Sequence, residues 1–525
     1  MELDLDPGLM FRDLDAFHKE VASCVTSGIN VEYTTIPIDH WDPSVGTYQN
    51  RYWVDDTYYR PGGPVFVYDG GESNAEIFVH SQFENSSSMI SQFMREFHGM
   101  GIIWEHRYYG DSLPFPISPE MPPEHLKYLT NKQALADLPY FARNFRRHNH
   151  PRSDSRPQST PWIMIGGSYS GSRAAFTRNE HPEIIYAAYA SSAPLQAQVN
   201  MSVYYDQIYR GMVANGYSSC IKDVQAALEY IDSQLSNNET AAAVKQLFFG
   251  LEAEENSNGD FTLALGGIYG FFQGYGTEGP AEGSVHDFCT YLETDPVTHN
   301  AAGPDGLAPT YGNKFLADRF ASWGVFTSLV NMNYGTNCKG LNKTLPTSCE
   351  LGRPITEPDN IAWAWQFCTE WGFYMIDNAG PRSLLSRYQT LEYYQDACNR
   401  AFPKALASGL LPSRPQAEAL NRETGGWNIR PSNVYWTGGQ FDPWRPLSIL
   451  STESMAPKIP FSADIPACGE ARDDHLFGYL MENAEHCLDF KANFKPGAIA
   501  RGHFVKALKR WLPCFKKQRG VGEVE

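Results

Sequence analysis

The sequence predicts an α/β protein organised around a mostly parallel β-sheet, and three observations carry that prediction. Residues 64–68, 101–104 and 162–165 are short apolar runs with little polar alternation. Each run ends in a polar or glycine-rich loop, which is typical of central strands covered on both faces. A strand, a helix, a strand, a glycine-flanked serine and a second helix follow one another along the chain, as in a doubly wound sheet.

Local patterns define the individual elements. Residues 1–60 are rich in aromatic side chains and are interpreted as entry strands and loops, with residues 51–54 alternating like a strand. Thr130 and Gln133 form a capping-box pattern ahead of apolar residues at helical spacing, which predicts a helix. Residues 184–190 and 433–436 are further predicted strands, and the basic segment 504–512 is predicted to be helical.

The middle of the chain has a different character. Residues 224–231 and 241–251 have helical patterns, whereas strand-like apolar runs are scarce from about 195 to 425. We therefore expect a sheet-containing core formed by residues 1–194 and 426–525. Residues 195–425 are interpreted as a mostly helical insertion that covers the sheet as a cap.

Composition restricts the functional class. The 525 residues include 42 Lys and Arg against 60 Asp and Glu, which gives a net charge of −18. Nucleic acids and anionic membranes are bound through clustered basic residues, so neither is an expected partner. No apolar stretch of about 18 residues occurs in the sequence, so no transmembrane helix is expected.

Several features favour an extracellular or a vacuolar or lysosomal location. The first six residues are acidic rather than basic and then apolar, so we expect that a signal peptide is absent from this chain. The ten cysteines form an even set without the CxxC spacing of metal sites, and no metal or cofactor is expected. Their pairing cannot be read from the sequence. Glycosylation sequons begin at Asn85, Asn200, Asn238 and Asn342.

Ser168 is the candidate nucleophile. It follows the predicted strand 162–165 and precedes a helix-compatible segment, which is the context of a nucleophile elbow. Such a sharp turn needs small neighbours, and Gly166, Gly167, Ser170 and Gly171 satisfy that need. The usual pattern has glycine two residues after the serine, where this chain has Ser170. A Gly/Ser loop that merely closes a strand is the alternative interpretation.

An elbow serine needs an acid and a base that follow it in the chain. Asp442 comes one turn after the predicted strand 433–436 and is the candidate acid, although an Asp-Pro turn would look the same. His475, His486 and His503 follow. Position favours His486 as the base, with His475 as the fallback. His106 precedes the serine, so we expect it to have a structural role.

Five segments in order resemble the family of lysosomal prolyl carboxypeptidase, dipeptidyl peptidase II and the fungal acid prolyl endopeptidases. They are Glu105–Gly110, Gly166–Gly171, Cys368–Gly372, Gly439–Trp444 and His486–Asp489. The resemblance spans about residues 65 to 490 and implies an α/β-hydrolase fold with a helical cap inserted after the elbow. It also implies cleavage on the carboxyl side of proline, with Ser168 as nucleophile, Asp442 as acid and His486 as base.

Two features depart from that family pattern. Glu485 stands beside the base where the family usually has small residues, and a carboxylate close to His486 would raise the pKa of the histidine. Residues 456–479 are interpreted as an extra loop between Asp442 and His486.

The remaining site residues are predicted from the needs of acyl transfer at proline. The N–H of Tyr169 and that of Gly70 or Gly71 would form an oxyanion hole. Trp444 resembles the family's pocket tryptophan, and Trp371 is a weaker candidate for the aromatic proline pocket. Glu72 or Glu370 would bind a substrate amino group, or would be a buried partner of Arg107 or another cation.

The predicted function is a post-proline serine peptidase acting on proline-containing peptides or proteins, as a monomer or homodimer. Endopeptidase, carboxypeptidase and aminodipeptidase modes stay open, because they depend on how the cap closes the cleft. An esterase or lipase on the same fold is one alternative. A catalytically silent hydrolase-fold binding protein is another, although such proteins usually lose a triad member and none is lost in this sequence.

Overall fold

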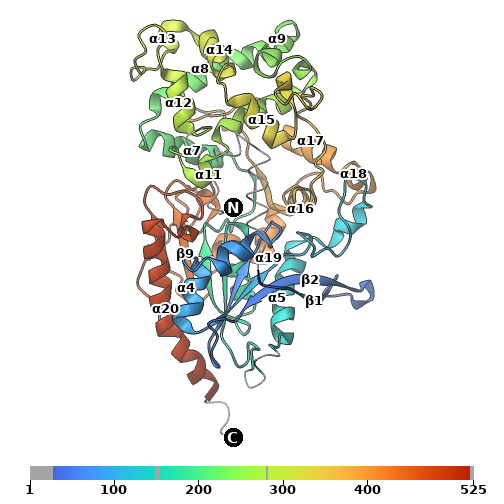
Figure 1. Cartoon of the computed structure of the whole chain (residues 1–525), viewed down its shortest axis with the longest axis vertical. Coiled ribbons are helices and arrows are strands. Elements are labelled where there is room, and N and C mark those ends of the chain that lie inside the picture. Colours follow the sequence, from blue (N-terminus) through green and yellow to red (C-terminus); the bar gives the residue numbers. More distant parts are fainter. Residues whose placement is uncertain (1–27, 148–149, 151–153, 280–281, 521–525) are drawn as a thin grey trace.

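The computed structural model describes residues 28–147, 150, 154–279 and 282–520. The acidic segment 1–6 and Cys24 lie outside these residues. A large sheet with its flanking helices forms one end of the molecule, and the helices of the middle of the chain form the other end (Figure 1). The two parts together give an α/β-hydrolase fold with a helical cap.

The main sheet has the strand order β1-β2-β4-β3-β5-β6-β9-β11-β10. Strand β2 is antiparallel to both of its neighbours, and the remaining described pairs are parallel. This order is that of the α/β-hydrolase sheet, with β10 added at the edge. The strands are β1 (Val31–Pro37), β2 (Thr47–Asp55), β3 (Val65–Asp69), β4 (Met100–Trp104), β5 (Trp162–Gly167), β6 (Ile185–Ser191), β9 (Val434–Gly439), β10 (Phe461–Ser462) and β11 (Leu476–Met481).

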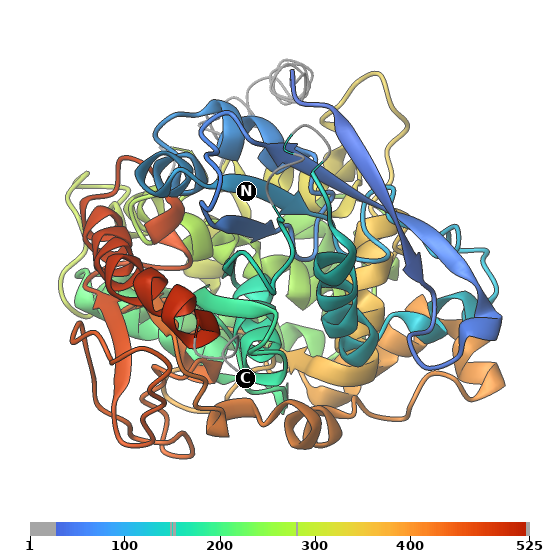
Figure 2. The same cartoon turned by 90° about the horizontal axis from the view of Figure 1, so that it is seen from below.

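Helices cover both faces of the sheet, as the unbroken apolar strands predict. Alternate residues of β3 illustrate this arrangement, because Val65 packs in one core with α5 (Asn131–Asn144) and α6 (Tyr169–Glu180). Phe66 packs in a second core with α4 (Met89–Phe97) and α20 (Lys495–Gly520). Seen from below, α20 and α5 lie on opposite sides of the sheet (Figure 2).

The predicted capping box of α5 is only half formed. Thr130 Oγ1 accepts a hydrogen bond from the Gln133 N–H at 3.3 Å. The Gln133 side chain does not return to Thr130, because its Nε2 donates to Asp39 Oδ1 at 2.8 Å and its Oε1 accepts from the His40 N–H at 3.0 Å. A tertiary contact with the loop after β1 has therefore replaced the local one.

Helices dominate the chain between β6 and β9. The prediction at 224–231 is confirmed, and the one at 241–251 is confirmed as far as Phe249, where the helix ends before Gly250. Two short strands, β7 (Gln198–Asn200) and β8 (Gly372–Tyr374), pair with each other. The helices are α7 (Val203–Ala214), α8 (Ser218–Leu235), α9 (Asn238–Phe249), α10 (Asn258–Leu265), α11 (Phe272–Tyr275), α12 (Val285–Glu293), α13 (Ala308–Tyr311), α14 (Asn313–Ala321), α15 (Phe326–Tyr334), α16 (Pro358–Gln366), α17 (Leu391–Ala401), α18 (Pro403–Ser408) and α19 (Ala417–Thr424).

Four disulfides join eight of the cysteines. Cys220–Cys289, Cys338–Cys349 and Cys368–Cys398 lie in the helical part, and Cys468–Cys514 ties α20 to the loop before β11. Among the described cysteines, Cys487 is the one left as a thiol.

The prediction that residues 456–479 form an extra loop is wrong at its carboxyl end. Leu476 begins β11, which pairs in parallel with β9 through contacts such as Gly478 with Trp436. The strand is short and follows a long loop, so periodicity alone does not reveal it. Because the last strand leads into the His486 loop, that loop starts from the sheet itself.

No helix within the described ranges is long and apolar enough to cross a membrane.

Candidate active site

Ser168 lies at a sharp turn between β5 and α6. Its backbone has φ +61° and ψ −130°, a conformation that non-glycine residues rarely adopt, and its N–H donates to the Ser191 carbonyl at 2.9 Å. A Cβ at Gly166 would lie 2.2 Å from the Ser170 carbonyl oxygen, and one at Gly171 would lie 2.7 Å from the Ser191 oxygen. Close approach of backbone therefore requires glycine on both sides of the serine.

Ser170 occupies the position where the usual elbow pattern has glycine. Its Oγ donates to the Gly167 carbonyl at 2.7 Å and accepts from the Gly167 N–H at 3.1 Å. These bonds close the turn from within, and they engage the Ser170 hydroxyl. Ser168 is thus the serine whose hydroxyl remains available for chemistry at this turn.

Asp442 and His486 form a buried pair. The His486 Nδ1 lies 2.8 Å from Asp442 Oδ1, and the same oxygen accepts the Trp444 N–H at 2.9 Å. Asp442 is fully buried, and His486 Nε2 has no hydrogen-bond partner among the described residues. Burial favours the neutral imidazole, but the nearby Asp442 and Cys487 outweigh it and hold the pKa of His486 well above its usual value.

The other two histidines lie away from Asp442. His475 precedes β11, at the opposite end of the strand from His486, and its Nε2 lies 2.8 Å from Ser462 Oγ. His503 lies within α20 and contacts the Tyr435 hydroxyl at 3.0 Å. His106 is buried and lies 3.1 Å from the Tyr169 hydroxyl.

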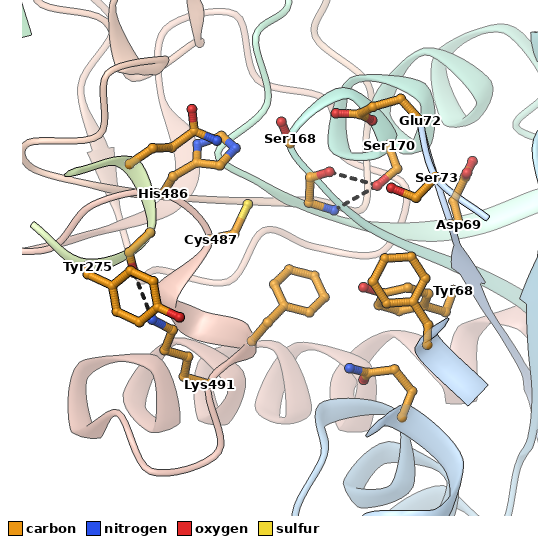
Figure 3. Close-up of a pocket in the computed structure, with 17 residues that line it drawn as sticks. Tyr68, Asp69, Glu72, Ser73, Ser168, Ser170, Tyr275, His486, Cys487 and Lys491 are labelled. Atoms are coloured by element: carbon orange, nitrogen blue, oxygen red, sulfur yellow. Dashed lines mark hydrogen bonds between the residues drawn. The ribbon is translucent and has the colours of Figure 1, made fainter. Parts of the chain in front are cut away.

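Ser168 and His486 line one cavity of about 240 Å³ (Figure 3). Glu72 and Gly70 also line it, so four of the predicted site residues meet there. Sequence reasoning missed much of the lining: Tyr68, Phe78, Gln82, Gln273, Gly274, Tyr275, Cys487, Phe490 and Lys491. Residues 273–275 come from the helical part of the chain, and the Gln273 carbonyl accepts the His486 N–H at 3.0 Å.

The two predicted tryptophans do not line this cavity among its described residues. Both are buried, and they flank Phe373 in an aromatic cluster with ring centroids 5.4 Å (Trp371) and 4.9 Å (Trp444) from it. The cluster borders the site, because Trp371 lies 5.5 Å from the Tyr169 ring and Trp444 lies 6.4 Å from the His486 ring.

The predicted oxyanion donors differ in availability. Tyr169 is the first residue of α6, so its N–H has no carbonyl one turn earlier in the helix. The Gly71 N–H donates to Asp69 Oδ1 at 2.9 Å, and the Gly70 N–H donates to the Trp104 carbonyl at 2.9 Å. Both glycine amides are therefore engaged in hydrogen bonds at the loop after β3.

The predicted acidic residues have separate surroundings. Glu72 lines the cavity, and burial raises its pKa. Glu370 accepts the Asn131 N–H at 2.8 Å, and burial raises its pKa to about 8. Neither pairs with Arg107, whose guanidinium binds Asp137 with contacts of 2.7 Å.

Glu485 is buried beside the dyad. A Cβ at Gly276 would lie 2.5 Å from its Oε1, so the carboxyl group packs directly against the helical part. Burial, followed by the Asp442 charge, raises the pKa of Glu485 to about 7.

The four sequon asparagines, Asn85, Asn200, Asn238 and Asn342, are all exposed.

A profile of the family described as "Serine carboxypeptidase S28" matches residues 36–495. A "Probable extracellular serine carboxypeptidase" of Arthroderma benhamiae is 27% identical over an alignment of 450 residues that covers 79% of this chain and 59% of that protein. The chain thus spans less than two thirds of that fungal relative.

Two mouse proteins align over more of their length. "Lysosomal Pro-X carboxypeptidase" of Mus musculus is 26% identical over an alignment of 504 residues that covers 93% of this chain and 90% of that protein. "Thymus-specific serine protease" of the same species is 27% identical over 502 residues, covering 92% and 87%. A solved proline iminopeptidase of Mycobacterium smegmatis is 11% identical, covers 91% of this chain and 100% of its own, and has a TM-score of 0.35.

Proposed function

The chain belongs to the serine carboxypeptidase S28 family and is a serine-type peptidase, and we propose that it hydrolyses peptide bonds on the carboxyl side of proline. Ser168 is the nucleophile, His486 the general base and Asp442 the acid. The observation that carries this assignment is the unpartnered His486 Nε2 in the cavity that Ser168 lines, with Nδ1 of the same ring 2.8 Å from the buried Asp442.

The chemistry follows from that geometry. Asp442 accepts the hydrogen bond from Nδ1–H, which leaves Nε2 to take the proton of Ser168 as Oγ attacks the carbonyl after proline. The imidazolium is stabilised by the Asp442 charge and gives its proton to the leaving amine. Water then repeats the sequence on the acyl-enzyme. The Tyr169 N–H supplies one hydrogen bond to the oxyanion.

Proline preference is supported by aromatic surroundings, since the proline ring offers no polar group to bind. Aromatic side chains line the cavity beside Ser168, and a proline ring that packs on them would hold its carbonyl near Ser168; they are those of Tyr68, Phe78, Tyr275 and Phe490. A lysosomal mouse relative carries Pro-X carboxypeptidase in its name, which favours the same specificity.

The charges of the cavity favour a carboxypeptidase mode. Lys491 is the one Lys or Arg in the described lining, and it lies on the His486 side in Figure 3, with Glu72 on the other side of Ser168. The leaving peptide receives its proton from the base and therefore departs on the His486 side. A single leaving residue would bring its α-carboxylate toward the Lys491 ammonium, which can form charge-assisted hydrogen bonds.

An extracellular or lysosomal location completes the proposal. Four disulfides form in the structure, and such bonds persist in oxidising compartments. The exposed sequon asparagines are accessible for glycosylation. Relatives are named extracellular and lysosomal.

The test uses matched peptides and mass spectrometry of the products. Wild-type protein and Ser168→Ala are incubated with a peptide whose penultimate residue is proline, with a second peptide carrying alanine there, and with the proline peptide amidated at its C-terminus. We expect release of one residue from the free proline peptide, and no product with the variant. Equal cleavage of the alanine peptide would contradict post-proline specificity. Hydrolysis of short acyl esters alone would favour an esterase.

Peptides with blocked ends separate the carboxypeptidase mode from the endopeptidase mode. If the substrate carboxylate contacts Lys491, the wild-type protein has a higher KM for the amidated peptide than for the free peptide. Lys491→Met likewise raises KM for the free peptide. Lys495→Met, which replaces an exposed lysine at the start of α20, leaves that KM unchanged. Cleavage of an internal proline bond in a peptide blocked at both ends would show an endopeptidase instead.

A further inference from the structure

The loop that carries His486 contains a second buried carboxylate, Asp489, three residues further along. Asp489 is fully buried and accepts three side-chain hydrogen bonds. The Ser191 hydroxyl donates to Oδ1 at 2.6 Å, and the hydroxyls of Tyr189 and Thr437 donate to Oδ2 at 2.7 Å and 2.6 Å. A buried carboxylate that accepts several hydrogen bonds is a rigid fixture, because breaking any of them leaves a buried polar group unpaired.

These donors come from the two strands that matter for the site. Tyr189 and Ser191 end β6, and Thr437 lies in β9, the strand that leads to Asp442. Ser191 also makes the second connection, because its carbonyl accepts the Ser168 N–H at 2.9 Å. One residue therefore binds the backbone of the nucleophile through its carbonyl and the Asp489 carboxylate through its hydroxyl.

The surroundings of Asp489 restrict the loop further. The Cys487 N–H donates to Ser192 Oγ at 3.0 Å, so the residue after the base is also held by the end of β6. On the far side, a Cβ at Gly497 would lie 2.7 Å from the Asp489 Cα, so the start of α20 packs directly against the loop. The Arg501 guanidinium donates to the Asp489 carbonyl.

We propose that Asp489 is a positioning residue for the reaction, and that its bonds to β6 and β9 hold His486 Nε2 at the correct place relative to Ser168 Oγ. This inference rests on the proposed triad. No hydrogen bond joins Asp489 to His486 or to Ser168 in the described structure, so Asp489 acts through the chain segments that carry them. Asp489 thereby holds the loop that carries His486 in one position instead of several.

The test compares Asp489→Asn with a matched control, Asp223→Asn. Asp223 is also fully buried, and it accepts backbone N–H groups of Leu307 and Ala308 at 2.8–3.0 Å in the helical part. Asp489→Asn keeps the side-chain volume, but its NH₂ group is a donor that faces hydroxyls which donate to the carboxylate in the wild type. Measured quantities are kcat, KM, the rate of fluorophosphonate labelling of Ser168, and the folded fraction from near-UV circular dichroism.

We expect Asp489→Asn to lower kcat and the labelling rate in the same ratio, by about 10- to 100-fold, because small misplacements of reacting groups cost rates of this size. KM stays unchanged, since the substrate contacts are intact, and Asp223→Asn keeps the wild-type kcat. Wild-type kcat in folded Asp489→Asn, or a change confined to KM, would overturn the inference.

Thr437→Val covers the case in which Asp489→Asn does not fold. It removes one of the three donors and keeps the carboxylate, so we expect a smaller fall in kcat at unchanged KM, and an unchanged kcat in the folded variant would again overturn the inference. Failure of the wild type to label contradicts the proposed triad itself. A labelled wild type with equally fast variants contradicts only the role of Asp489.

Discussion

Replacing Asp442 with asparagine removes the charge that stabilises the His486 imidazolium. Asp442 Oδ1 binds both the Trp444 N–H and His486 Nδ1, at 2.9 Å and 2.8 Å, while Oδ2 is buried without a described partner. The amide oxygen of asparagine fits the Oδ1 position, which leaves its NH₂ group unpaired at the Oδ2 position. The fold is retained by the Trp444 contact, but the buried ion pair is lost when the imidazolium forms.

The magnitude follows from that burial. Removing one partner of a buried ion pair costs about 3–5 kcal/mol. In the active form of the proposed triad, in which His486 is neutral, the pair is complete only while the base holds the Ser168 proton, so the cost falls mainly on the transition state. Because each factor of ten in rate is about 1.4 kcal/mol, we expect kcat of Asp442→Asn to fall between about 10²- and 10⁴-fold.

The assay is kcat/KM as a function of pH. The base acts deprotonated, so kcat/KM of the wild type rises with pH through the His486 pKa, which lies above 6.5 in the free enzyme. Burial lowers that pKa and the Asp442 charge raises it. Asp442→Asn removes the larger of the two causes that raise the pKa of His486, so the acid limb moves to lower pH while the plateau drops. An acid limb at the same pH in both proteins, or full activity of the folded variant, would refute this reasoning.

Three further outcomes follow from the same region. Glu485 has a pKa of about 7 against its usual 4.5, so the folded state retains a proton that the unfolded chain loses. The stability that protonated Glu485 contributes to the folded state is present below pH 4.5 and is lost as pH rises through 7. Over that pH range, the free energy of unfolding measured with urea should fall for the wild type relative to Glu485→Gln by at most about 3 kcal/mol. Parallel plots of unfolding free energy against pH for the two proteins would contradict this expectation. Gly171→Ala should cost about 1–3 kcal/mol in unfolding free energy through contact with the Ser191 carbonyl, whereas Gly502→Ala, with open space around its Cβ, should not destabilise α20. Iodoacetamide should inactivate the wild type by alkylating the cavity thiol Cys487, and Cys487→Ala should resist it; equal inactivation of both would locate the reaction elsewhere.

The nucleophile turn was predictable because its constraints are local. A strand, small residues and a helix-compatible segment are contiguous in the sequence, and the structure shows why glycine is needed at 166 and 171. His486 was favoured over His475 by its position in the chain and by the family resemblance of the segment His486–Asp489, and it is the histidine beside Asp442. The strand that orients it, β11, was missed, because six residues after a long loop carry little periodic signal.

The rest of the cavity was not predictable from local pattern. Tyr275 and Gln273 reach Ser168 through the folding of a helical segment more than a hundred residues away in sequence. Aromatic side chains look alike in a core and in a pocket, so the burial of Trp371 could not be read from its type. Gly71 was chosen for its freedom of backbone, but the sequence does not reveal that its N–H is bound by Asp69.

The most direct measurement is the site of fluorophosphonate labelling in the folded wild-type protein, found by peptide mass spectrometry. The proposed triad predicts one adduct on the peptide that contains Ser168, at the Ser168 hydroxyl, and its loss in Ser168→Ala and His486→Ala. Absence of an adduct in folded protein, or an adduct on Ser170 instead, would contradict the assignment of Ser168 as the activated nucleophile.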